Sequence, residues 1–236
     1  MINYIFCLKI ASFAIVSILS LSCQKSIIRQ LKQTQAAAQQ KPQPNLTYGD
    51  LVIKEQLDHI LIPVSLADRD VDKESYYDSS RSNSGINQYI NIIFYSKKDS
   101  KTHLLLNKKA IVTAFELLPH KQEKNPFRFW FYQIIDSDIN GDKKLDYQDA
   151  RIAYLSDLSG KNVQQITPNN TQVMNWTVVP SVDAIFIKIL KDSDNDKKFT
   201  DKDETNFIKV NLDKPGIGTE IISDEIQQQI KSLFLQ

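Results

Sequence analysis

Two acidic segments, residues 138–149 and 192–203, recur about 54 residues apart in this chain of 236 residues. A run of aromatic and β-branched residues precedes each segment, and another follows it. Short runs of this composition, bounded by Asp, Asn, Ser, Gly or Pro, are typical of β-strands. The repeat therefore predicts a unit of strand, acidic loop, strand, turn and short strand, and with it a mainly β fold.

Strand-like runs continue through the rest of the chain and predict β-meanders over residues 47–236. Residues 68–87 are polar and serine-rich and predict an exposed loop, whereas Ser223 begins the one clear helix. The predicted strands are residues 59–66, 89–95, 103–106, 110–118, 127–135, 152–155, 175–179, 184–190 and 206–212.

Oxygen-bearing residues recur at the same positions in both acidic segments. Numbered from the first aspartate, positions 1, 3, 5, 9 and 12 carry side-chain oxygens, position 7 offers its carbonyl, and position 8 is apolar. These positions hold Asp138, Asn140, Asp142, Lys144, Asp146 and Asp149 in the first segment and Asp192, Asp194, Asp196, Lys198, Thr200 and Asp203 in the second, with Leu145 and Phe199 at position 8.

This spacing resembles the EF-hand calcium loop, in the form found in dockerins, and predicts two Ca²⁺ sites. Two positions depart from the usual pattern. Lys143 and Lys197 replace the glycine of position 6, where a left-handed lysine costs about 1 kcal/mol. Asp149 and Asp203 replace the longer glutamate of position 12. Both departures predict weak affinity, with dissociation constants of about 0.1–1 mM. Flanking strands instead of helices favour a structural role for calcium over a sensor role.

A second register is possible for the first loop, beginning at Asp136. It places Gly141 at position 6, but it also places Lys143 at the apolar position and Tyr147 at position 12. The register from Asp138 is therefore preferred. Asp136 is then expected to lie behind the ligands as an additional acid.

The N-terminal residues 1–22 predict a signal peptide, because Lys9 is followed by an apolar stretch too short for a membrane span. Residues 19–23, Leu-Ser-Leu-Ser-Cys, resemble the lipobox of bacterial lipoproteins, in which the cysteine is lipidated. Ser20 stands where that motif usually has an aliphatic residue. The resemblance implies a lipid anchor on Cys23, and the alternative is an ordinary cleaved signal or an uncleaved helix.

Residues 23–46 are rich in Gln, Lys and Ala, which predicts a tether between the anchor and the β-rich domain. The only other cysteine, Cys7, lies within the predicted signal peptide, so the mature chain could form no internal disulfide.

Composition and motifs argue against several classes of function. A net charge of +1, with no basic run interleaved with aromatics, argues against nucleic-acid binding. The three histidines, His59, His103 and His120, are isolated in the sequence, and no nucleophile or phosphate-binding motif is present. The chain is therefore predicted not to be an enzyme, and its aromatic residues are expected in the core.

One further resemblance concerns the strands. Residues 152–168, with Asp157-Leu-Ser-Gly160 in their middle, resemble a blade of the TolB-type β-propeller, and residues 94–106 resemble it more loosely. The resemblance implies propeller-like blades with the acidic loops inserted between strands. The length suffices for only three or four blades, so a partial propeller and a sandwich of β-meanders are both open.

Together these features predict a calcium-binding, lipid-anchored protein of the bacterial cell envelope, on the periplasmic face or the cell surface. Its role would be a binding or scaffold module for an envelope protein or a glycan, with calcium mainly structural. The alternative is a calcium-stabilised envelope hydrolase that acts on glycans.

Overall fold

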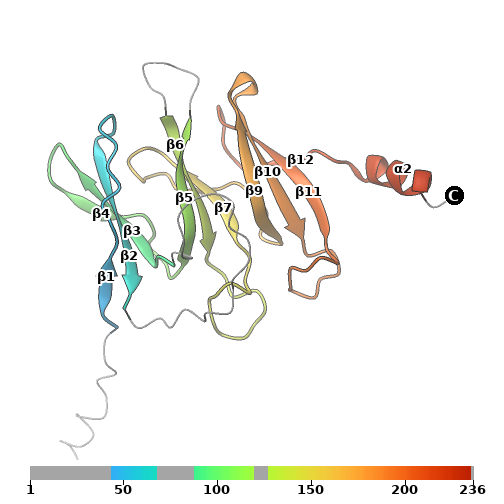
Figure 1. The fold of residues 1–236 in the computed structure, drawn as a ribbon, viewed down its shortest axis with the longest axis horizontal. Helices are drawn as coiled ribbons and strands as arrows, with labels where there is room; N and C mark the ends of the chain where they lie inside the picture. Colours follow the sequence, from blue (N-terminus) through green and yellow to red (C-terminus); the bar gives the residue numbers. More distant parts are fainter. Residues whose placement is uncertain (1–43, 68–87, 120–126, 235–236) are drawn as a thin grey trace, which may run out of the picture. The chain divides into compact units, whose positions relative to one another are not determined.

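The computed structural model describes residues 44–67, 88–119 and 127–234, which form three four-stranded antiparallel sheets and one C-terminal helix (Figure 1). In each sheet the strands follow one another in chain order as a meander. Sheet A holds β1 (Leu46–Tyr48), β2 (His59–Leu66), β3 (Asn91–Ser96) and β4 (Thr102–Leu104). Sheet B holds β5 (Ile111–Pro119), β6 (Phe127–Ile135), β7 (Ile152–Ser156) and β8 (Gln164–Gln165). Sheet C holds β9 (Thr171–Val179), β10 (Ala184–Lys191), β11 (Glu204–Asn211) and β12 (Thr219–Glu220).

The mainly β prediction is confirmed, and all nine predicted strands are present with small shifts at their ends. The sequence analysis missed β1, β8 and β12, which have only two or three residues and no apolar run. A short 3-10 helix, η1 (Pro180–Val182), joins β9 to β10. The predicted helix is α2 (Asp224–Phe234), and the hydroxyl of Ser223 accepts a hydrogen bond from the N–H of Ile226 at 3.4 Å.

Several predictions fall outside the described residues: the signal peptide, the lipidated Cys23, most of the tether, and the loop over residues 68–87. The described sheets all belong to one compact unit, Leu46–Gln236. Within the described part of the chain, no helix has the length and apolar character needed to cross a membrane.

Sheet B is covered on both faces, because successive residues of a strand point to opposite sides. Trp130 and Tyr132 of β6 join the first core, which they share with Phe94 and other residues of sheet A. Phe131 and Leu155 join the second core, between sheets B and C. The three sheets therefore form a stack in which both faces of the middle sheet are covered, and Trp130, Phe131 and Tyr132 lie in the core as the sequence predicts.

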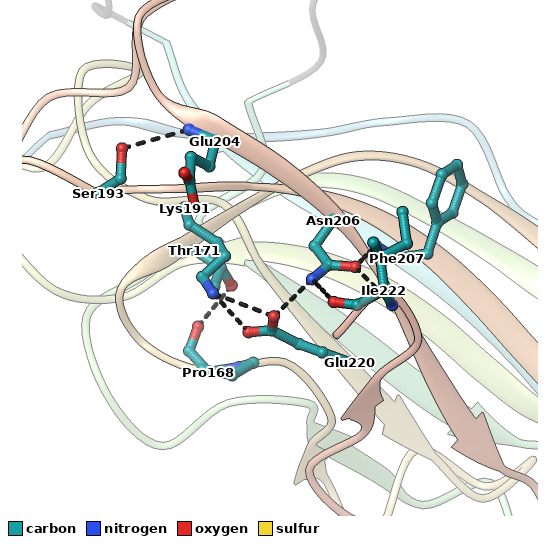
Figure 2. A network of polar contacts seen from close by, with 9 residues as sticks. All are labelled: Pro168, Thr171, Lys191, Ser193, Glu204, Asn206, Phe207, Glu220 and Ile222. Atoms are coloured by element: carbon teal, nitrogen blue, oxygen red, sulfur yellow. Dashed lines mark hydrogen bonds and ion pairs between the residues drawn. The ribbon is translucent and has the colours of Figure 1, made fainter. Parts of the chain in front are cut away.

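Two asparagines on third strands perform the same structural task in sheets A and C. The side-chain amide of Asn206 donates to the carbonyl of Ile222 at 2.9 Å and accepts from its N–H at 3.2 Å (Figure 2). Asn91 bonds Leu106 in the same two ways, at 2.8 and 3.1 Å. Each asparagine side chain thus adds one pair of hydrogen bonds beyond the backbone pairing of the strands. It holds the residue two positions after the end of the fourth strand.

Sheet B has no asparagine at the equivalent position. The N–H of Ile166 donates to the carbonyl of Ala153 just as the N–H of Ile221 donates to the carbonyl of Phe207. Ala153 therefore corresponds to Phe207, and Ile152 corresponds to Asn206. The buried hydroxyl of Thr167 accepts the N–H of Ala153 at 2.9 Å instead. The three sheets are therefore repeats of one design, although only the last two carry a recognisable sequence repeat.

The turn between β7 and β8 holds sheet B against sheet A. Burial alone would raise the pKa of Asp157, but hydrogen bonds from Ser159, Lys161 and Asn162 outweigh it and lower that pKa. Gly160 ends the turn with φ +76°, and the ring of Phe94 lies where its side chain would be.

Replacement of Gly160 by alanine is expected to lower the free energy of unfolding by about 2–4 kcal/mol, from left-handed strain and overpacking. A Cβ at this position would overlap the ring of Phe94. Urea unfolding in excess EGTA measures the change. The matched control is Gly141→Ala, which has φ +79° but open space around its Cβ, so that only about 1 kcal/mol of strain is expected. Equal losses in the two variants would contradict the packing argument.

Candidate metal centre

Both acidic loops occupy the same place in their sheets. Residues 138–149 connect β6 to β7, and residues 192–203 connect β10 to β11, so each loop joins the second strand of a sheet to the third. Figure 1 shows the two loops, in yellow and orange, at the same end of the sheets. The predicted repeat of strand, acidic loop, strand, turn and short strand is therefore present in sheets B and C.

Position 1 of each loop accepts the N–H of position 6. Lys143 donates to Oδ2 of Asp138 at 2.8 Å, and Lys197 donates to Oδ2 of Asp192 at 3.2 Å. Two further bonds recur, from position 5 to the side chain of position 3 and from position 7 to that of position 5. The loop is thus curled so that backbone N–H groups point at the side-chain oxygens of positions 1, 3 and 5.

The aspartate at position 12 closes each loop. Oδ1 of Asp149 accepts the N–H of Ile139 at 2.9 Å, and Oδ2 accepts that of Asp146 at 3.1 Å. Asp203 accepts the N–H groups of Ser193 and Thr200 in the same way, at 3.0 and 2.8 Å. A carboxylate oxygen has a second lone pair, so these bonds leave each aspartate able to contact a cation.

In the second loop these bonds also favour the charged form of the carboxylate. Hydrogen bonds from the backbone of Thr200 and of Ser193 lower the pKa of Asp203 below its usual value. Asp203 therefore serves as a fixed anion that ties the two ends of the second loop together.

The two lysines at position 6 adopt the left-handed conformation that the sequence analysis predicts. Lys143 has φ +67° and Lys197 has φ +63°. Position 4 is left-handed in both loops as well, with Gly141 at +79° and Asn195 at +58°. The two loops therefore share a backbone path although their sequences differ at both positions.

Three carboxylates converge in the second loop. Asp192, Asp194 and Asp196 offer one oxygen each within 4.8 Å of one another, and this group could hold a metal ion. Oδ1 of Asp192 is buried and accepts no hydrogen bond from any described residue. A buried carboxylate oxygen with no donor is costly, so its position fits a cation better than solvent.

In the first loop, hydrogen bonds occupy more of the ligand oxygens. Its middle ligand is an amide, Asn140, and both oxygens of Asp138 already accept hydrogen bonds. The additional donor is the N–H of Gly141, at 2.7 Å from Oδ1. The first loop therefore leaves less oxygen free for a cation than the second.

The apolar residue at position 8 attaches each loop to the body of the protein. Leu145 is buried against Ile111 and Ile135 at the ends of β5 and β6. Phe199 is half-buried and packs against the first core. The loops thus begin and end on strands and are pinned in their middle.

Asp136 makes its hydrogen bonds to residues outside the loop, and its expected place behind the ligands stays a prediction. Its side chain is 6% exposed, and it accepts hydrogen bonds from Lys108 at 2.5 Å and from the hydroxyl of Tyr154 at 2.6 Å. Burial and this bond to Asp136 raise the pKa of Tyr154. Asp136, which follows β6, is thus bound to Tyr154 of β7 and to Lys108, which precedes β5.

Two residues that look isolated in the sequence are neighbours in the fold. The rings of His59 and His103 lie 6.0 Å apart on the face of sheet A that packs on sheet B. His103 Nε2 is 2.8 Å from the carbonyl oxygen of Ser159, and burial together with His103 lowers the pKa of His59. His120 lies outside the described residues.

Ser193, at position 2 of the second loop, is a contributor that the sequence analysis missed. Its hydroxyl donates to Asp203 at 3.2 Å. The same hydroxyl accepts the N–H of Glu204 at 3.3 Å (Figure 2). No ligand template includes position 2, so only the small polar side chain beside Asp192 could have indicated this role.

Replacement of Lys197 by glycine is expected to raise the free energy of unfolding in EGTA by about 0.5–1 kcal/mol, since glycine adopts a positive φ without strain. The control is Lys202→Gly, a substitution in the same loop at an exposed residue without a positive φ. It is expected to destabilise slightly. Thermal unfolding of both variants measures the difference, and a loss of stability in Lys197→Gly would contradict the strain argument.

Comparison of the chain with protein-family models, with curated proteins and with solved structures finds no significant match.

Proposed function

We propose that this chain binds two calcium ions, one in each acidic loop, within a binding or scaffold module that is anchored to a bacterial membrane through Cys23. The observation that carries the proposal is the shared hydrogen-bond pattern of the two loops. Two segments with different sequences hold their oxygens at positions 1, 3, 5 and 12 in the same way. A common ligand is the simplest reason for a shared loop that includes strained lysines.

The donor set favours a hard cation. The predicted ligands in the loops are carboxylate, amide, hydroxyl and carbonyl oxygens, with no imidazole or thiolate among them. Zinc and copper prefer nitrogen and sulfur ligands, whereas oxygens suit calcium and magnesium. Calcium tolerates a high and irregular coordination number, and a loop that offers six positions matches that preference better than it matches octahedral magnesium.

The role that the position of the loops supports is structural. Each loop joins two neighbouring strands and is pinned at position 8, so a bound ion would stiffen the connection without moving a helix. The two loops lie at the same end of their sheets, which makes that end a rigid surface when both ions are bound. Such a surface suits the contact with an envelope protein or a glycan.

The stack of three meanders is also compatible with propeller-like blades. Each sheet has four antiparallel strands in chain order, and neighbouring sheets pack face to face. This arrangement supports the architecture that the TolB-type resemblance implies, as an open stack of three blades.

Titration calorimetry with Ca²⁺ is expected to give two weak sites, with dissociation constants of about 0.1–1 mM. We expect the tighter site in the second loop, because Asp192 keeps one oxygen free of hydrogen bonds. Asp192→Ala should remove that site, and Asp138→Ala should remove the weaker one. Saturation at a hundredfold excess over the dissociation constant should add about 2.7 kcal/mol of stability per site.

The matched control is Asp201→Ala, which removes an exposed acid of the second loop that is not a predicted ligand. It should bind calcium as the unmodified chain does. An excess of Mg²⁺ separates calcium binding from general attraction of divalent cations to acidic loops. No heat with the unmodified chain, or equal losses in Asp192→Ala and Asp201→Ala, would refute the proposed sites.

The anchor is tested separately by Cys23→Ser, which should move the protein from the membrane fraction to the soluble fraction of a bacterial host. Loss of the acyl chains removes about 0.8 kcal/mol per buried methylene, which is enough to end stable anchoring. Cys7→Ser lies within the predicted signal peptide and should leave the membrane fraction unchanged. If both variants fractionate like the unmodified chain, the anchor proposal is wrong.

A further inference from the structure

The sequence contains a single Asn-Gly pair, Asn140–Gly141, and it lies at positions 3 and 4 of the first loop. An asparagine before glycine is prone to attack on its side-chain amide by the next backbone nitrogen, because glycine has no side chain to obstruct the approach. Gly141 is exposed, and a Cβ at this position would have no atom within 4 Å. The space around the pair is therefore open to water.

The backbone nitrogen of Gly141 is held beside a proton acceptor. Its N–H donates to Oδ1 of Asp138 at 2.7 Å, which is within the reach of a general base. The other oxygen of Asp138 accepts the N–H of Lys143 at 2.8 Å, and this bond fixes the carboxylate. Because an N–H lies in the plane of its peptide, the bond to Asp138 leaves both faces of the Gly141 nitrogen free to form a new bond.

The amide carbon of Asn140 is polarised by a further hydrogen bond. Its Oδ1 accepts the N–H of Asp142 at 2.9 Å, and negative charge would collect on this oxygen as the carbon is attacked. Backbone N–H groups at such a distance stabilise an oxyanion. The side-chain nitrogen of Asn140, which would leave as ammonia, donates to none of the residues that the structure describes.

Asn91 and Asn206 are arranged differently. Both the oxygen and the nitrogen of each side chain are bonded to the backbone of the sheet. The next N–H, of Ile92 or Phe207, points at the oxygen of the asparagine itself and belongs to a residue with a bulky side chain. The contacts that give these two asparagines their structural task therefore also oppose attack on them.

We propose that Asn140 is a site of self-catalysed deamidation, in which the backbone nitrogen of Gly141 attacks the side-chain carbon Cγ of Asn140. The proton of this nitrogen passes to Asp138 and from there to the departing Nδ2. The bond from the Gly141 nitrogen to Cγ forms, and the bond from Cγ to Nδ2 breaks and releases ammonia. One water then opens the five-membered succinimide. Hydrolysis at Cγ gives an ordinary aspartate, and hydrolysis at the backbone carbonyl carbon gives isoaspartate.

The second loop indicates what the aspartate product would do. Its position 3 is Asp194, which offers one oxygen within 4.8 Å of those of Asp192 and Asp196. An aspartate at position 3 of the first loop would complete the same set with Asp138 and Asp142. The affinity of such loops for calcium depends on the number of charged ligands, so this product should bind calcium more tightly. This consequence, unlike the reaction, rests on the proposed function.

Peptide mapping by mass spectrometry tests the reaction, after incubation of the full chain at mildly alkaline pH in excess EGTA. Conversion at Asn140 should be at least about tenfold faster than at Asn195, because the contacts of the first loop orient and polarise the reacting groups. Asn195 is the matched control, since it is exposed in the second loop and is followed by Asp196 instead of glycine. Equal rates at the two asparagines would overturn the proposal.

Two variants test the groups that carry the reaction. Gly141→Ala places a methyl group beside the attacking nitrogen, and Asp138→Asn removes the proton acceptor with little change of shape. Each should slow conversion of Asn140 by about tenfold or more. Asp201→Asn, at an exposed acid of the second loop, should leave the rate unchanged. A variant Gly141→Ala or Asp138→Asn that reacts as fast as the unmodified chain would refute the proposed route.

Calcium distinguishes this proposal from the proposed function. A bound ion would occupy the oxygens of Asn140 and Asp138, so Ca²⁺ at a hundredfold excess over the dissociation constant should slow conversion by about tenfold or more. If the rate in EGTA is as expected but Ca²⁺ does not change it, the calcium site of the first loop is wrong and the deamidation site stands. In titration calorimetry, Asn140→Asp should bind calcium more tightly than the unmodified chain, and an unchanged affinity would refute the proposed effect of the product.

Discussion

The burial of sheet B on both faces is the constraint on which the rest of the structure depends. A chain of this size that makes sheets of only four strands cannot close one of them on itself, so each sheet needs a neighbour to cover its apolar side. Alternation along β6 sends Trp130 and Tyr132 one way and Phe131 the other, and thereby provides both cores. Because the stack sets the direction of β6 and β10, it also brings both acidic loops to one end.

The loops themselves are held by short-range bonds. Asp149 and Asp203 accept N–H groups from positions 2 and 9, so most of the polar contacts of a loop come from its own residues. This explains why a pattern of twelve positions suffices to predict the backbone path, including the left-handed Lys143 and Lys197. Asp136 lies just outside the loop, and Lys108 and Tyr154 bind its carboxylate.

Strands with strong apolar runs could be predicted from the sequence, because their period of two and their composition are local properties. The three shortest strands could not, since β1, β8 and β12 exist only through pairing with a longer neighbour. The sequence also concealed the third repeat. Sheet A shares the asparagine of sheet C but has no described acidic loop, whereas sheet B has the loop and uses Thr167 instead of an asparagine. The three sheets thus share a hydrogen-bond pattern, although only two of them share a recognisable sequence repeat.

The amide of Asn206 ties the segment after β11 to the inside of sheet C. Its oxygen and nitrogen bond the N–H and the carbonyl of Ile222, and its nitrogen also donates to Glu220 at the end of β12. Because Asn206 is 1% exposed, release of this segment would leave its side-chain nitrogen buried without a partner among the described residues, which is an unfavourable state. An edge strand of only two residues is thus fastened from within the last layer rather than by its own ladder.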